Sequence, residues 1–145
     1  MIYLPASNEK VIHDIKPEGR ILAGRETILL VDDEAVVIDV TKDILETLGY
    51  QALVVTGGGE AIQLYRKSGH QIDLVILDMV MPGMGGSETF DILKSINPKI
   101  KVILSSGYSM NSQVKKIMEK GVQAFLQKPF RIDQLSQKIR DVLGN

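Results

Sequence analysis

From Thr27 to Leu143 the sequence alternates between short apolar runs and longer segments with helical spacing of apolar residues. The first run is continuous, as expected of a strand that is covered on both faces of a parallel sheet. The predicted strands are residues 27–31, 51–55, 74–77, 101–105 and 124–127, and the predicted helices are residues 33–48, 60–68, 87–96, 112–120 and 132–143. Parallel strands that alternate with helices need right-handed crossovers, so the pattern predicts a doubly wound α/β sandwich.

The beginning of the chain does not continue this alternation. Residues 2–5 form a short apolar run that ends at a proline, and prolines and glycines interrupt the polar stretch that follows. A stretch without a sustained period is typical of a linker. We therefore expect a linker over residues 1–25 and one folded domain over residues 26–145.

The composition excludes several classes of function. A formal net charge of −1 gives no global attraction to nucleic acid or to an anionic membrane. The chain has no cysteine, which excludes disulfides, thiolate metal sites and a cysteine nucleophile. No apolar run approaches the roughly 20 residues that span a bilayer, and the N-terminus lacks the pattern of a signal peptide. We expect a cytoplasmic domain without direct membrane contact, whether or not its parent chain is membrane-anchored.

Chemically active side chains occur where the predicted strands end. Asp32 and Asp33 follow the first strand, Asp78 the third, Ser106 the fourth and Lys128 the fifth. Each residue alone has an ordinary explanation as a helix cap, a turn residue or a solvated charge. Ligands of this architecture bind beyond the carboxyl ends of the strands, so the joint occurrence of these residues indicates a functional site.

The chemistry of this set is that of phosphoryl transfer. Three neighbouring carboxylates repel one another unless a cation lies among them, and Mg²⁺ prefers such oxygen ligands. An aspartate can attack phosphorus to form an acyl phosphate. A lysine and a hydroxyl can then bind the oxygens of the transferred group. The set predicts a magnesium-dependent transfer of a phosphoryl group to an aspartate.

From about Glu26 onward, the chain resembles the receiver domain of two-component response regulators. Four segments carry the resemblance in the family's order and spacing: residues 30–34 (LVDDE), 76–84 (ILDMVMPGM), 104–107 (LSSG) and 128–130 (KPF). The resemblance implies a flavodoxin-like (CheY-like) fold with five helices and a five-stranded parallel sheet of order 2-1-3-4-5. It also implies a phosphoacceptor in a phosphorelay, which promotes its own phosphorylation without being a turnover enzyme by itself.

The resemblance also implies the roles of the acidic residues. Asp78 would be the phosphoacceptor. Asp32, Asp33 and the backbone carbonyl of Val80 would complete a site for Mg²⁺ with it, and Mn²⁺ would be able to substitute.

The remaining roles concern the phosphoryl group and the conformational switch. Lys128, which precedes a cis peptide bond in this family, would bind the phosphoryl group together with Ser106 and Gly107. Ser106 and Phe125 would be the switch residues. Val80 and Tyr108 lie two residues beyond Asp78 and Ser106, and neither side chain is suited to orienting an attacking water. We therefore expect slow self-dephosphorylation.

The expected donor is a phosphohistidine of a histidine kinase or a histidine phosphotransfer domain. Val37, Val40 and Ile44 form the predicted core stripe of the first helix, which leaves Val36 and Ile38 exposed as candidates for donor docking. The resemblance implies that the fourth helix, fifth strand and fifth helix form an output or homodimer surface. No contact with nucleic acid is expected.

Residues 2–5 (IYLP) resemble the last strand of the ATP-binding domain of histidine kinases. Because no output domain follows Asn145, we favour the C-terminal receiver of a hybrid histidine kinase over a stand-alone regulator. Two other classes stay open: a phosphatase with an aspartyl nucleophile, and an interaction module that has lost the chemistry. The contiguous acidic pair argues against the first class, and the presence of Asp78 and Lys128 argues against the second.

Overall fold

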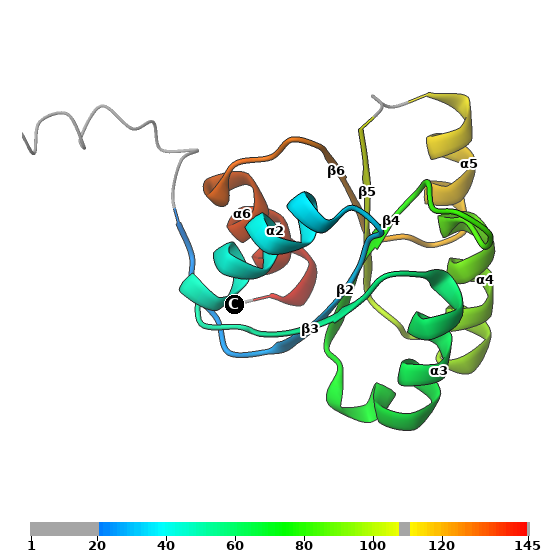
Figure 1. Ribbon diagram of the computed structural model, residues 1–145, viewed down its shortest axis with the longest axis horizontal. Helices are drawn as coiled ribbons and strands as arrows, with labels where there is room; N and C mark the ends of the chain where they lie inside the picture. Colours follow the sequence, from blue (N-terminus) through cyan, green and yellow to red (C-terminus); the bar gives the residue numbers. More distant parts are fainter. Residues whose placement is uncertain (1–20, 108–110, 145) are drawn as a thin grey trace, which may run out of the picture.

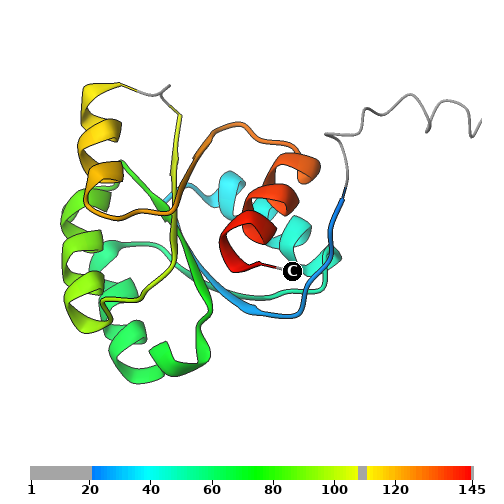
Figure 2. The same ribbon diagram turned by 180° about the vertical axis from the view of Figure 1, so that it is seen from behind.

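The structure, a computed structural model, describes residues 21–107 and 111–144. Within these ranges, a five-stranded sheet lies between two layers of helices (Figures 1 and 2). The kinase-like residues 2–5 and Tyr108 lie outside the described residues, so the predictions made on them stay predictions.

All strand pairs of the sheet are parallel, and the spatial order is β3-β2-β4-β5-β6. Counted along the chain this is the order 2-1-3-4-5, so the predicted flavodoxin-like fold is confirmed. The strands are β2 Thr27–Val31, β3 Gln51–Val55, β4 Leu74–Asp78, β5 Val102–Ser106 and β6 Ala124–Gln127. β4 and β5 end one residue later than predicted, which makes Asp78 and Ser106 the last residues of their strands.

Five α-helices occur within the described ranges. They are α2 Ala35–Thr47, α3 Gly58–Ser68, α4 Gly86–Ile96, α5 Ser112–Glu119 and α6 Ile132–Leu143, and the short 3-10 helix η2 Gly69–Gln71 follows α3. α2 begins later than its predicted start at Asp33, because the backbone at Glu34 is still extended. The side chain of Asp32 holds this turn by accepting a hydrogen bond from the Glu34 backbone N–H at 2.9 Å.

The sheet separates two hydrophobic cores. Helices α3, α4 and α5 cover one face, and α2 and α6 cover the other (Figure 1). The side chains of β2 alternate between the two cores, with Leu29 and Val31 in the first and Ile28 and Leu30 in the second. Burying such a side chain stabilises the fold by roughly 1.5–3 kcal/mol. Burial on both faces therefore explains the continuous apolar run of this strand and fixes the position of its carboxyl end.

The N-terminal half of α2 packs differently from the predicted stripe. Val40 was expected in the core and Ile38 at the surface, and both predictions are wrong. Val40 is 52% exposed, whereas Ile38 packs against the core beneath α2 and α6. Val36 is 75% exposed, as predicted. The exposed apolar pair on α2 is therefore Val36 and Val40, which are four residues apart and share one face of the helix.

Residues 22–26 lie against the end of α2 and against α6. The Gly24 N–H donates to the Leu48 carbonyl at 3.0 Å, and Arg140 of α6 forms an ion pair with Glu26 at 2.7 Å. A Cβ atom on Gly24 would overlap the ring of Tyr50, so this close approach requires glycine. The domain boundary after residue 25 stays a prediction, but the residues just before it contact the folded domain.

No helix in the described part of the chain is long and apolar enough to cross a membrane.

Candidate functional site

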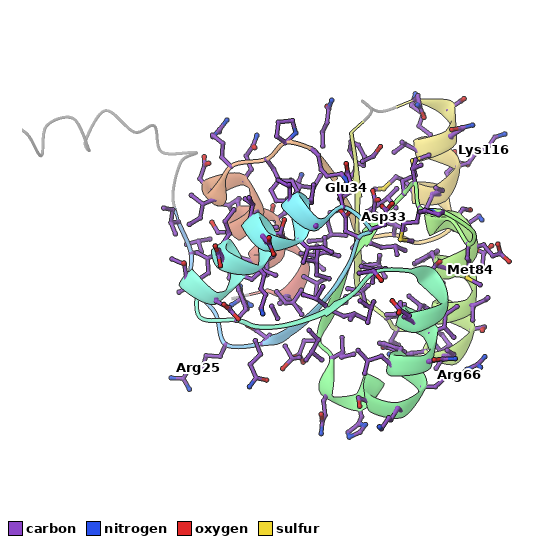
Figure 3. All side chains as sticks on the ribbon, viewed as in Figure 1. Arg25, Asp33, Glu34, Arg66, Met84 and Lys116 are labelled. Carbon is purple, nitrogen blue, oxygen red and sulfur yellow. The ribbon has the colours of Figure 1, made fainter. Side chains whose placement is uncertain are left out.

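The predicted site residues meet at the carboxyl edge of the sheet. Asp32 follows β2, Asp78 ends β4 and Ser106 ends β5, while Lys128 follows β6. Asp33 and Glu34 lie where the chain passes from β2 into α2 (Figure 3). Parallel pairing of adjacent strands places these chain ends together, because every strand points toward the same edge.

Three aspartates form an acidic cluster at this edge. One carboxylate oxygen each of Asp32, Asp33 and Asp78 lies within 4.8 Å of the others. Asp32 and Asp78 are buried and Asp33 is exposed. Burial and, after it, the charge of Asp32 together raise the pKa of Asp78 to about 6, against the opposing effect of Lys128. A set of oxygen ligands with excess negative charge suits a hard divalent cation such as Mg²⁺.

The Lys128 ammonium lies among three carboxylates. Its Nζ is 3.1 Å from Asp32 Oδ2, 3.1 Å from Asp78 Oδ1 and 3.3 Å from Glu34 Oε1. Burial lowers the pKa of Lys128, but the charges of Asp78 and Asp32 outweigh that effect and raise it. The backbone holds the lysine as well, because its N–H donates to the Ser106 carbonyl at 2.7 Å. The peptide bond between Lys128 and Pro129 is cis, as the resemblance implied.

The end of β5 and the start of α4 complete the edge. Ser106 is buried at the end of β5, next to Gly107, which is exposed. On the other side of Asp78, Gly86 begins α4 in close contact with β4. A Cβ atom on Gly86 would lie 2.6 Å from the Asp78 carbonyl oxygen, so glycine lets the helix start directly beside the acidic cluster.

The comparisons with known proteins agree with this geometry. The family described as the response regulator receiver domain matches residues 28–140. This chain belongs to that family. The domain is a receiver, and receivers of this kind serve as phosphoacceptors in two-component phosphorelays.

Individual relatives cover the receiver to different extents. It is 31% identical over 118 residues to sporulation initiation phosphotransferase F of Bacillus subtilis, covering 81% of this chain and 94% of that protein. It is 33% identical over 122 residues to sensor kinase CckA of Brucella abortus, covering 84% of this chain but only 13% of the kinase. Among solved structures, a chain of the CheX–CheY–BeF3–Mg complex of Borrelia burgdorferi superposes with a TM-score of 0.78 at 26% identity, covering 83% of this chain and 90% of that chain.

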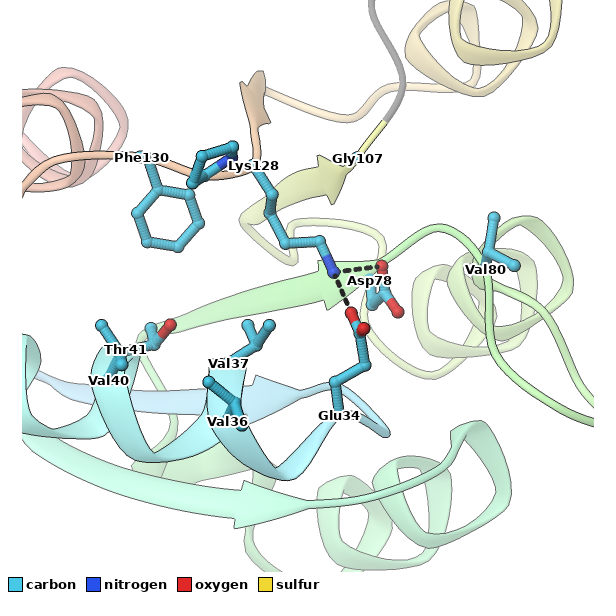
Figure 4. A pocket seen from close by; sticks show the side chains of 11 residues that line it. Glu34, Val36, Val37, Val40, Thr41, Asp78, Val80, Gly107, Lys128 and Phe130 are labelled. Atoms are coloured by element: carbon cyan, nitrogen blue, oxygen red, sulfur yellow. Dashed lines mark hydrogen bonds and ion pairs between the residues drawn. The ribbon is translucent and has the colours of Figure 1, made fainter.

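A groove of about 610 Å³ opens from the acidic site of the receiver along α2. Its polar end holds Asp78 and Lys128, and its apolar end holds side chains of α2 and of the segment that follows β6 (Figure 4). The apolar lining consists of Val36, Val37, Val40, Pro129 and Phe130. Val80, the exposed residue two positions beyond Asp78, lines the groove from the opposite side (Figure 4).

The structure does not bring Phe125 into the acidic site of the receiver. Its half-buried ring packs against the core beneath α3, α4 and α5. It also lines a surface hollow beside Met118 of α5 and Lys138 of α6. The residue is thus placed between the core and the surface made by α5, β6 and α6.

Two features of the site were not found by sequence reasoning. Glu34 was noted only as part of the LVDDE segment, although it contacts Lys128. Phe130 was noted only as part of the KPF segment, although it lines the groove with Val40. Both residues lie in the segments that carried the resemblance, which was the available signal.

Proposed function

We propose that Asp78 accepts a phosphoryl group from a phosphohistidine in a magnesium-dependent reaction. The observation that carries this proposal is the buried Asp78 carboxylate at the end of β4, with two more carboxylates within 4.8 Å and the Lys128 ammonium at 3.1 Å. A carboxylate oxygen of Asp78 forms the new bond to phosphorus as the P–N bond of the donor breaks, and the bonding electron pair returns to the imidazole.

The acidic cluster is the proposed cation site. Asp32, Asp33 and Asp78 would hold Mg²⁺ together with the backbone carbonyl of Val80, and Mn²⁺ would fit the same oxygen ligands. When bound, the ion supplies positive charge to the oxygens of the transferred group.

The cationic and hydroxyl groups of the edge are the proposed ligands of the phosphoryl group. Lys128 already contacts Asp78, and Ser106 and Gly107 lie at the end of the neighbouring strand. Attraction of Ser106 to the phosphoryl group would bias a two-state change that extends to Phe125. The half-buried position of Phe125 supports this role, because its ring borders both the core and the surface of α5, β6 and α6. We propose that surface as the output or homodimer interface.

The proposed donor is the histidine-bearing helix of a histidine kinase or of a histidine phosphotransfer domain, docked in the groove along α2. The exposed pair Val36 and Val40 offers it an apolar surface, and the groove leads from there to Asp78. Val40 replaces Ile38 in this proposal, because Ile38 packs against the core.

We further propose that the domain is the receiver of a hybrid histidine kinase in the cytoplasm. The similarity to sensor kinase CckA supports this, although the match covers only 13% of that protein. Stand-alone regulators of similar identity are also known, such as chemotaxis protein CheY of Bacillus subtilis at 32%.

The self-dephosphorylation of the proposed acyl phosphate should be slow. The apolar Val80 lies exposed beside Asp78 and cannot orient a water for attack on phosphorus. Val80→Asn is expected to shorten the lifetime, measured as decay of the modified mass after removal of the donor. An unchanged lifetime would argue against this role of Val80.

Intact-mass measurement after incubation with a small acyl phosphate tests the central proposal. With Mg²⁺ we expect a single adduct of about 80 Da, the mass of HPO₃, that is absent in Asp78→Asn and absent without the metal. Asp39→Asn, an exposed change of the same charge on α2, should still form the adduct. An adduct on Asp78→Asn would refute the assignment, and steady turnover of a phosphomonoester would favour a phosphatase.

A further inference from the structure

Glu34 is the acidic residue of the site that the proposed function leaves without a role. It occupies the N-cap position of α2, but its side chain makes no hydrogen bond to the start of that helix. Its Oε1 instead lies 3.3 Å from Lys128 Nζ, and Figure 4 shows the carboxylate reaching toward the ammonium from the α2 side of the groove.

The hydrogen-bonding capacity of Lys128 is fully used in this arrangement. An ammonium group has three N–H donors, and Lys128 has three carboxylate acceptors, one each from Asp32, Asp78 and Glu34. Lys128 must therefore give up one of these contacts before it can bind the oxygens of an arriving phosphoryl group.

The three carboxylates differ in how easily they can be released. The side chains of Asp32 and Asp78 are 2% and 5% exposed, whereas that of Glu34 is 62% exposed. A buried carboxylate that loses its partner also lacks water to replace it, and this is costly. Glu34 can turn into solvent, so its contact with Lys128 is the one that is exchanged at the lowest cost.

We propose that Glu34 is a positioning residue that holds Lys128 in the resting site and competes with the phosphoryl group for it. This inference rests on the proposed function of Asp78. Glu34 lines the groove between the acidic site and the apolar residues of α2, so a donor that fills the groove comes close to it. Its charge also opposes small anionic phosphoryl donors.

The test compares Glu34→Gln with wild type in the full chain. With Mg²⁺ and a small acyl phosphate at low ionic strength, we expect Glu34→Gln to raise the rate constant of modification at Asp78 about two- to fivefold. Added salt should reduce this difference, because the group is exposed. The matched control is Glu46→Gln, which removes the same charge from an exposed position in the last turn of α2 and should leave the rate constant unchanged.

A second readout does not depend on the reaction. Beryllofluoride is an anion that mimics the phosphoryl group. Its affinity for the domain can be obtained from the rise of the domain's unfolding midpoint as the beryllofluoride concentration increases in the presence of Mg²⁺. Glu34→Gln should bind it about two- to fivefold more tightly, and Glu46→Gln should match wild type.

The outcomes separate this inference from the proposed function. If wild type is modified at Asp78 and Glu34→Gln reacts no faster and binds beryllofluoride no more tightly, the role of Glu34 is refuted and the function stands. If wild type shows no adduct at Asp78 with either small acyl phosphate or phosphoramidate, the proposed function itself fails.

Discussion

Two cations of this domain are equally shielded from water but have opposite surroundings. The side chains of Lys128 and Arg140 are each 11% exposed. Arg140 pairs with one carboxylate, Glu26, at 2.7 Å, and lies 5.9 Å from the centre of the Tyr50 ring. Lys128 contacts three carboxylates, with Asp33 of the acidic cluster close by. The pair of Arg140 and Glu26 is balanced in charge, whereas the carboxylates around Lys128 leave an excess of negative charge.

The pKa values follow this difference. The Arg140 side chain lowers the pKa of Glu26, chiefly through the hydrogen bond between them, so the pair stabilises the fold at neutral pH. Burial and the charge of Asp32 raise the pKa of Asp78 to about 6, so its ionised form opposes folding until a cation arrives. A buried cluster that is unbalanced in this way is the electrostatic mark of a ligand site, and a balanced pair is the mark of a structural contact.

The strongest test of this comparison replaces each cation by methionine. With Mg²⁺ present, Lys128→Met is expected to lower the rate constant of Asp78 phosphorylation at least about a hundredfold, because it removes positive charge from the transferred group. Arg140→Met should leave that rate constant within about twofold of wild type, while lowering the free energy of unfolding by roughly 1–2 kcal/mol. Intact-mass kinetics and urea unfolding measure the two effects. Equal effects of both variants on the phosphorylation rate constant would contradict the assignment of Lys128 to the reaction and of Arg140 to the fold.

A smaller effect than that of Lys128→Met is expected for Asp78→Asn, on the free energy of unfolding in the absence of metal. Asp78→Asn removes the carboxylate whose pKa is raised from 3.8 to about 6, so it should increase the free energy of unfolding at pH 7 by on the order of 1–3 kcal/mol. The folded state of wild type binds the proton more tightly than the unfolded state, so wild-type stability should fall as the pH rises from about 4 to about 6. Asp78→Asn should lack this part of the slope.

Urea unfolding across that pH range, with and without Mg²⁺, measures this effect. Saturating Mg²⁺ should reverse the advantage of the variant, because wild type alone retains the full carboxylate cluster. A variant that is less stable than wild type in metal-free buffer would contradict the view that this cluster opposes folding.

The smallest effect concerns the balanced pair. Glu26→Gln should lower the free energy of unfolding by about 0.5–1 kcal/mol at pH 7. The pKa of Glu26 is lowered from 4.5 in the folded state, so its contribution is present above that value and is lost as the pH falls through the folded pKa. Wild type and variant should therefore converge in stability once the pH lies below the lowered pKa of Glu26. A difference that persists at lower pH would indicate lost packing rather than lost charge.

The fold was predictable where local pattern and tertiary packing agree. β2, β3, β6 and α6 have the predicted bounds, because the strands coincide with short apolar runs and the helix with apolar residues at helical spacing. The face of α2 was not predictable. Val36, Val37, Ile38 and Val40 are all apolar, so spacing alone gave no preferred side, and packing against the core beneath α2 and α6 decided which of them is buried.

The candidate site was predictable as a set of residues but not as a set of contacts. Asp32, Asp78 and Lys128 could be predicted from their positions at the carboxyl ends of strands. Parallel topology brings these ends together regardless of the conformation of the intervening loops. The contact of Glu34 with Lys128 joins residues 94 positions apart and depends on where α2 begins. The Glu26–Arg140 pair joins residues 114 positions apart, and no local pattern signals it.

The close contact between Gly24 and Tyr50 has a practical consequence for shortening the chain. A fragment that begins at Glu26, where the sequence pattern places the start of the domain, would keep the ion pair to Arg140 but lose the backbone that covers the tyrosine ring. The freed aromatic surface would lie beside the new N-terminus and would favour association between copies. A fragment for solution work should therefore start before Ile21, so that Tyr50 stays covered.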